Sequence, residues 1–342
     1  MLRFLDSRAC RLVIAAGFLV GQRAAADPVA DFYRGKTITL TVGTGAGGGY
    51  DTYARVVARH LARFIPGEPI IVVKNNPGAG GLVLANFLYN VAPKDGTEIG
   101  TFNRTIPFDP LLGNAQAQFD PLRYTWIGSP ANEVSTCVAW HEAGIRTVED
   151  LRQRELVVGG TGNTTDSVIY PRLSNALLGT KFKIVTGYPG GAAAILAMER
   201  GETKGWCGWA YSSMEAQRPG WFAERKIHVL MQYGPKPNPA FGKVPLAHEL
   251  TRTPRERQMF ELIVAPQLFA RPYMAPPGVP AERAAALQKA FATMVKDVAF
   301  IAEATTRRLD LDLVTAAEIL ATLQKAYATP KELVEEVKTL LK

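Results

Sequence analysis

The chain has 342 residues, of which 47% are hydrophobic and 20% charged, a globular composition that excludes a disordered, collagen-like or coiled-coil chain. Lysine and arginine number 39 against 31 acidic residues, which gives a net charge of +8. This excess is scattered along the chain, whereas nucleic-acid binding needs a clustered basic stripe, so we predict no nucleic-acid partner. The length suits two domains, each with its own core.

The N-terminus has the order of a secretory signal peptide. Arg3, Arg8 and Arg11 precede the apolar residues 12–20, and small residues follow at 24–26. The apolar run is too short to cross a bilayer as a helix. We predict cleavage after Ala26 and export of a soluble protein to the periplasm.

The remaining chain holds two cysteines, Cys137 and Cys207, and the sequence leaves open whether they pair in an oxidising compartment. The four histidines fall at no metal-ligand spacing, so no metal site is predicted.

Strands and helices alternate along the body of the chain. Residues 36–42 and 70–73 read as β-branched strands, and each runs into a glycine-rich turn, at 43–49 and 75–81, that opens an apolar helix. The pattern recurs after the strands at 155–158 and 183–185, whose turns span 159–166 and 188–191. This alternation predicts an α/β fold with mainly parallel sheets flanked by helices.

These turns predict anion-binding sites. The first amides of a helix lack intrahelical partners and carry the positive end of its dipole, and glycine lets a ligand approach the backbone closely. Four such turns at strand ends predict a cleft that holds a small anion.

One glycine turn also matches a dinucleotide fingerprint, Gly43-x-Gly45-x-x-Gly48. The acidic residue 20 positions further on, Glu68, lies in a turn ahead of the second strand instead of at its end, and we therefore predict no nicotinamide or other cofactor. The chain has no GxSxG and no GxxxxGK[ST] motif, so no catalytic residue is assigned, and a periplasmic enzyme stays as an alternative.

Several of these motifs resemble those of the Bug-type receptors of tripartite tricarboxylate transporters. VGTGAGGGYDTYAR (42–55) is similar to their VPFxPGGxxDxxAR loop, VVKNNPGAGG (72–81) to VVENRPGAGG, YPGG (188–191) to PYKGG, and APPGVP (275–280) to APxGxP. Gly43 and Ala46 depart from the family's prolines, and Pro189 from its lysine.

The resemblance implies a monomeric, two-domain periplasmic binding protein, a type II-like flytrap, that closes on a small organic carboxylate and delivers it to membrane permease subunits. It implies that residues 27–130 and 273–342 form domain 1, with the C-terminal helices packed on it. Residues 131–230 then form domain 2, and residues 231–272 the return crossing. A sensor receptor for a signalling partner is the alternative to transport, and the ligand's identity stays open.

The resemblance also implies which residues contact the ligand, mainly through backbone amides and hydroxyls. Trp209 and Tyr211, at alternate positions of a predicted strand, are expected to share one face of it. In one interpretation one or both of Trp206 and Trp209 form a wall of the pocket and favour a bulky or aromatic carboxylate, so Trp209 joins the candidates; in the other, they pack in the core. The candidates are Gly45, Ala46, Gly47, Gly48, Gly49, Tyr50, Asp51, Gly78, Ala79, Gly80, Gly81, Thr161, Thr164, Thr165, Tyr188, Gly190, Gly191 and Trp209.

Two polar residues have alternative interpretations. Asp51 is either a capping residue of the first helix or a group that contacts a hydrogen-bond donor of the ligand. Arg104, just after a strand, is expected on the surface, with pairing to a carboxylate as the alternative.

Overall fold

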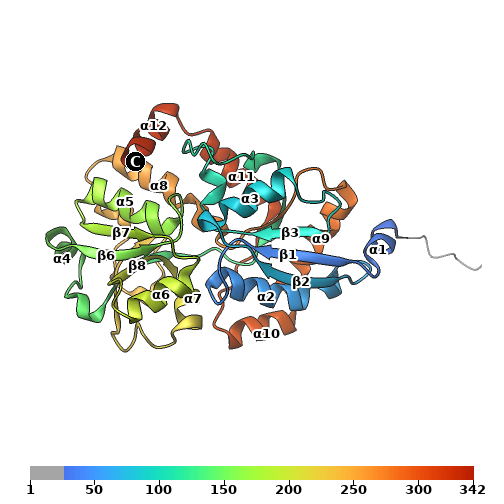
Figure 1. Ribbon diagram of the computed structural model, residues 1–342, viewed down its shortest axis with the longest axis horizontal. Coiled ribbons are helices and arrows are strands. Elements are labelled where there is room, and N and C mark those ends of the chain that lie inside the picture. Colours follow the sequence, from blue (N-terminus) through green and yellow to red (C-terminus); the bar gives the residue numbers. More distant parts are fainter. Residues whose placement is uncertain (1–26) are drawn as a thin grey trace, which may run out of the picture.

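Two β-sheets, each flanked by helices, lie side by side in the computed structural model, which describes residues 27–342 (Figure 1). The predicted signal peptide and its cleavage site after Ala26 lie outside the described residues. The two-domain α/β architecture predicted from the sequence is confirmed.

The first sheet has six strands in the order β11-β4-β10-β3-β1-β2. Its strands are β1 (Thr37–Val42), β2 (Ile70–Asn75), β3 (Glu98–Thr101), β4 (Thr125–Ser129), β10 (Tyr273–Ala275) and β11 (Val314–Thr315). The helices of this half are α1 (Pro28–Tyr33), α2 (Gly49–Leu61), α3 (Leu82–Asn90), α9 (Ala281–Val295), α10 (Val298–Thr306) and α11 (Ala316–Tyr327). Helix α2 packs on β1 and β2 because Tyr53, Val56 and Val57 form one buried face.

The second sheet has five strands in the order β7-β6-β8-β5-β9. Its strands are β5 (Ser135–Trp140), β6 (Leu156–Gly160), β7 (Phe182–Thr186), β8 (Gly205–Ala210) and β9 (Ile227–Tyr233). The helices of this half are α4 (Val148–Gln153), α5 (Asp166–Leu178), α6 (Gly191–Glu199), α7 (Tyr211–Gln217) and α8 (Pro254–Val264). Helices α5, α6 and α7 pack directly on the sheet.

Both sheets are mixed, whereas the alternation of strands and helices predicted mainly parallel ones. β1 is parallel to β2 and β3, and β6 is parallel to β7 and β8. The chain passes between the sheets twice, after β4 and after β9, and the strand that follows each passage, β5 or β10, inserts antiparallel into the middle of the other sheet. The two passages thus connect the domains at the point where the sheets face each other.

The C-terminal helices divide between the two halves. Helix α9 packs on β4, and α10 packs on α2. The last helix, α12 (Lys331–Leu340), instead lies against α5 and α8 of the second half, where Arg172 Nη1 donates to the carbonyl of Leu341 at 2.9 Å (Figure 1). The segment 273–342, which the resemblance assigned to domain 1, therefore ends on helices of the second half.

The two remaining cysteines pair. Cys137 on β5 and Cys207 on β8 are directly opposite each other, with Cα atoms 4.0 Å apart, and form a fully buried disulfide. It fixes the inserted strand β5 to its neighbour.

Within residues 27–342, every helix is too short or too polar to cross a bilayer.

Candidate functional site

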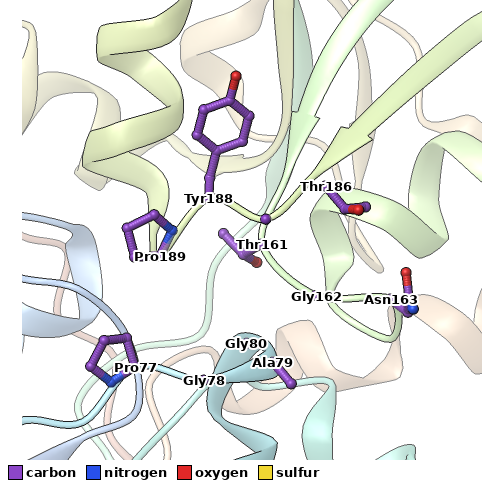
Figure 2. Close-up of a pocket in the computed structure, with 11 residues that line it drawn as sticks. Pro77, Gly78, Ala79, Gly80, Thr161, Gly162, Asn163, Thr186, Tyr188 and Pro189 are labelled. Carbon is purple, nitrogen blue, oxygen red and sulfur yellow. The ribbon is translucent and has the colours of Figure 1, made fainter.

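Glycine-rich turns from both halves meet where the sheets face each other. The turns after β1 and β2 lead into α2 and α3, and those after β6 and β7 lead into α5 and α6. Figure 2 shows residues 77–80 of the first half opposite residues 161–163 and 186–189 of the second. The halves touch directly, because the amide of Gly45 donates to the carbonyl of Pro189 at 2.9 Å.

Two cavities lie between these facing turns, and Thr161 lines both. The inner one, which we call the inner cavity, has a volume of about 50 Å³. It is lined by Thr44, Gly48, Gly49, Tyr50, Asn103, Arg104, Thr161, Asp166, Gly190, Gly191, Trp206, Gly208, Trp209, Ser213, Gln217 and Arg271. The outer cavity, about 440 Å³, is lined by residues 77–80, 161–163 and 186–189, as drawn in Figure 2.

Three helices begin at the inner cavity. Gly49, Asp166 and Gly191, the first residues of α2, α5 and α6, all line it. A helix N-terminus carries about half a positive charge and unpaired amides. The inner cavity is therefore an environment that favours an anion.

Two buried arginines strengthen that field. Arg104 follows β3 and is 1% exposed, and Arg271 precedes β10 and is 3% exposed. Arg104 Nη1 donates to Gln267 Oε1 at 2.6 Å, and Arg271 Nη2 donates to Ser213 Oγ at 2.6 Å. The expectation that Arg104 lies on the surface is wrong: β3 ends against the second half, which covers the side chain.

The arginines are balanced by two buried acids. Glu133, in the first passage between the sheets, lies 2.8 Å from Arg271 and 3.6 Å from Arg104, and Asp166 lies 3.4 Å from Arg104. Burial by itself lowers the pKa of Arg104, but Tyr50 and the two acids raise that pKa more, so its guanidinium stays charged. The ring centroid of Tyr50 lies 4.7 Å from the guanidinium carbon of Arg271, which holds this arginine over the start of α2.

A bulge in β8 turns both tryptophans toward the inner cavity. Cys207 pairs with Cys137 and Trp209 pairs with Thr136, which leaves Gly208 (φ +82°) as the extra residue. Trp206 and Trp209 are both buried and both line the inner cavity, so they belong to the wall of the pocket and to the core at once. The prediction that Trp209 and Tyr211 share a strand face is wrong, because Tyr211 begins α7.

The predicted site residues fall into three groups. Gly48, Gly49, Tyr50, Thr161, Gly190, Gly191 and Trp209 line the inner cavity. Gly78, Ala79, Gly80, Thr161 and Tyr188 line the outer one, although the ring of Tyr188 points away from the facing turn in Figure 2. Gly45, Ala46, Gly47, Asp51, Gly81, Thr164 and Thr165 line neither cavity.

Some of the third group hold the turns in place instead. Asp51 accepts hydrogen bonds from the amide of Gly47, from Arg55 Nε and from Asn75 Nδ2, each at 2.9 Å. These bonds occupy its carboxylate within the first half and fix the turn before α2, whose N-cap residue is Gly48. Thr165 Oγ1 donates to the carbonyl of Gly162 at 2.8 Å and so fixes the turn that enters α5.

Sequence reasoning missed several residues of the inner cavity, including Asp166, Arg271, Ser213 and Gln217. Asp166 is the last residue of the predicted polar turn 159–166, which was the one signal available for it. Arg271 lies in a passage between sheets, where no local pattern indicates burial.

Comparison with known proteins shows which of their folds this chain shares. No family model matches the chain. A Cupriavidus necator protein, "UPF0065 protein in gbd 5'region", is 26% identical over 235 residues, 66% of this chain and 67% of that protein. The periplasmic binding protein BugD superposes with a TM-score of 0.71 at 17% identity, covering 89% of this chain and 98% of its own.

The fold is that of the Bug periplasmic binding proteins. The resemblance predicted from the glycine motifs is thereby confirmed. MatC from Rhodopseudomonas palustris with bound malate has the same fold (TM-score 0.68, 18% identity, 90% of this chain and 99% of that chain). So does an R. palustris protein with adipate (TM-score 0.69, 18% identity, 89% and 97%).

The Bug fold of this chain offers no cluster of three or more metal-binding side chains within residues 27–342. The polar groups between its halves are amides, hydroxyls, guanidiniums and carboxylates, which suit an organic ion held by hydrogen bonds.

A buried acid at the contact between the halves gives a pH prediction. Thr164 Oγ1 donates to Asp109 Oδ2 at 3.0 Å, and burial raises the pKa of Asp109 from 3.8 to about 7. Between these values the folded state binds more protons than the unfolded state, so this group lowers stability as the pH rises. Asp109→Asn removes the titration. We expect the unfolding free energy of the variant, measured by urea unfolding, to rise relative to that of the wild type as the pH increases from 5 to 8.

A pH-independent difference between Asp109→Asn and the wild type would contradict this prediction, because it would mean that Asp109 ionises equally in both states.

Proposed function

We propose that the chain is an exported periplasmic receptor that captures a small organic carboxylate between its two halves and delivers it to a tripartite tricarboxylate-type permease. The observation that carries the proposal is the inner cavity, where three helix N-termini and two buried guanidiniums converge. Malate and adipate in the structures of two proteins with this fold support the ligand class.

Capture fits the way the two halves meet. The hydrogen bond from Gly45 to Pro189 and the contact between Thr164 and Asp109 join loops of opposite halves. A ligand that contacts both halves stabilises this closed arrangement by its differential affinity for it. The closed surface is then what a permease would recognise.

The proposal is tested with the purified chain from Asp27 onward against mono-, di- and tricarboxylates. An acid present at 100 times its dissociation constant is expected to add about 2.7 kcal/mol to the unfolding free energy, visible as a shift of a few degrees in Tm. Isothermal titration calorimetry then gives the affinity, and chromatography of the mixture is expected to return the acid unchanged. Absence of binding by every acid, or conversion of one of them, would refute the proposal.

Delivery has a separate readout. Cells that carry the permease are expected to take up the bound acid only when this protein is also present. Normal uptake in its absence would remove the transport role and leave a sensor receptor.

A further inference from the structure

Six buried polar atoms around the inner cavity make no hydrogen bond with any group of residues 27–342. They make up more than half of the eleven such side-chain atoms in this part of the chain, so they gather at this one place. They are Thr44 Oγ1, Arg104 Nε, Asp166 Oδ2, Trp209 Nε1, Gln217 Oε1 and Arg271 Nε. Buried polar atoms in native proteins are nearly always paired, so this gathering indicates the polar groups of a ligand.

The six atoms include both hydrogen-bond donors and hydrogen-bond acceptors. The nitrogens of Arg104, Trp209 and Arg271 donate, whereas the oxygens of Asp166 and Gln217 accept. A carboxylate only accepts hydrogen bonds, so it satisfies the nitrogens and leaves the two oxygens unpaired. A ligand that satisfies both kinds needs a donor as well as a carboxylate.

Asp166 is held so that one oxygen stays free for that donor. Its Oδ1 accepts from Asn103 Nδ2 at 2.9 Å and from the amide of Ser167 at 3.0 Å. Its Oδ2 forms an ion pair with Arg104 Nε at 3.4 Å but accepts no hydrogen bond within residues 27–342. The bulge residue Gly208 packs against this carboxylate, since a Cβ there would lie 2.8 Å from Asp166 Cγ. Asp166 is 3% exposed, so bulk water does not satisfy the free oxygen.

We propose that the inner cavity selects a small carboxylic acid that carries a hydroxyl or amino group beside its carboxylate. The nitrogens of Arg104, Arg271 and Trp209 donate hydrogen bonds to the carboxylate. Asp166 and Gln217 accept hydrogen bonds from the neighbouring hydroxyl or amino group of the acid. The cavity of about 50 Å³ has room for about three to five water-sized groups, which suits the compact end of such an acid. This inference rests on the proposed function, because it names the class of acid that the receptor takes.

The test compares acids that differ only in the donor. Calorimetry is done with propionate, lactate and alanine, and with succinate, malate and aspartate. In at least one series, the hydroxy or amino acid is expected to bind at least about tenfold more tightly than the plain acid, because the plain acid leaves buried acceptors unpaired. Tighter binding of lactate or malate identifies a hydroxyl, and tighter binding of alanine or aspartate an amino group.

The two proposals fail in different ways. Equal affinity for plain and substituted acids would overturn this inference and leave carboxylate capture standing. Absence of binding by any acid would overturn the proposed function, and this inference with it.

Two variants assign the selectivity to residues. In Asp166→Asn, the amide oxygen stays toward Asn103 Nδ2 and the Ser167 amide, so its NH₂ group faces the cavity where an acceptor was. We expect the preference for the substituted acid over the plain acid to disappear. Gln217→Met removes the second acceptor at similar size and is expected to reduce the preference, which keeps the test intact if Asp166→Asn fails to fold. Asp31→Asn, in the exposed first turn of α1, is the matched control. A preference unchanged in both cavity variants would overturn the assignment.

Discussion

Replacing Gly162 with alanine is expected to lower ligand affinity at least about 100-fold, a loss of about 2.7 kcal/mol. Gly162 lies in the turn between β6 and α5, and a Cβ there would lie 2.7 Å from the carbonyl carbon of Ala79 and 2.9 Å from the amide nitrogen of Gly80. Both contacts are with backbone of the opposite half, which has no flexible end to move aside. The substitution therefore opposes closure, and the closed fraction limits the apparent affinity.

The fold of each half is expected to survive this change. The φ angle of Gly162 is outside the left-handed region, so alanine fits the local backbone. We expect an unchanged Tm without ligand, weak binding by calorimetry and a larger radius of gyration by X-ray scattering.

Gly45→Ala is the matched control at the same contact between halves. Its Cβ would meet Pro189 at 3.4 to 3.6 Å, which is ordinary contact, and Gly45 lines neither cavity. It is expected to bind close to the wild-type affinity. Wild-type affinity in Gly162→Ala as well would show that capture does not need this contact between the turns.

The fold was predictable because its repeated unit is local. Strand, glycine turn and helix follow one another within about 25 residues, and the strands predicted at 36–42 and 70–73 are β1 (Thr37–Val42) and β2 (Ile70–Asn75). The antiparallel strands β5 and β10 escaped prediction because their partners lie far away along the chain. β5 pairs with β8 and β9, which follow only after β6 and β7. β10 pairs with β3 and β4 of a much earlier segment and has three residues, too few for a periodic pattern.

The parts of the site that consist of backbone turns were predictable from the sequence. The parts where side chains from distant segments meet were less predictable. Six of the residues suggested by the glycine motifs line the inner cavity. The ionic partners Glu133 and Arg271 are 138 positions apart, and neither stands in a motif. The shared face of Trp206 and Trp209 depends on the bulge at Gly208, which a strict alternation of strand faces does not predict.

Replacing Glu133 with glutamine is expected to lower the unfolding free energy by about 3–5 kcal/mol, because it leaves a buried positive charge without its partner. Glu133 Oε2 lies 2.8 Å from Arg271 Nη2 and 3.6 Å from Arg104 Nη1, and all three side chains are at most 3% exposed. The amide keeps the hydrogen bond from Ser212 to Oε1, so the change isolates the charge. Urea unfolding followed by tryptophan fluorescence and circular dichroism measures the loss.

Glu336→Gln provides the control. It removes the exposed partner of Arg255, at a similar ion-pair distance of 2.7 Å, and is expected to leave stability unchanged. Adding a ligand to Glu133→Gln distinguishes a general packing defect from a missing charge. A bound carboxylate restores negative charge beside Arg104 and Arg271, so saturating acid is expected to stabilise Glu133→Gln more than it stabilises the wild type. Equal stabilisation of both proteins would contradict a carboxylate site at these arginines, even if the loss of stability itself is observed.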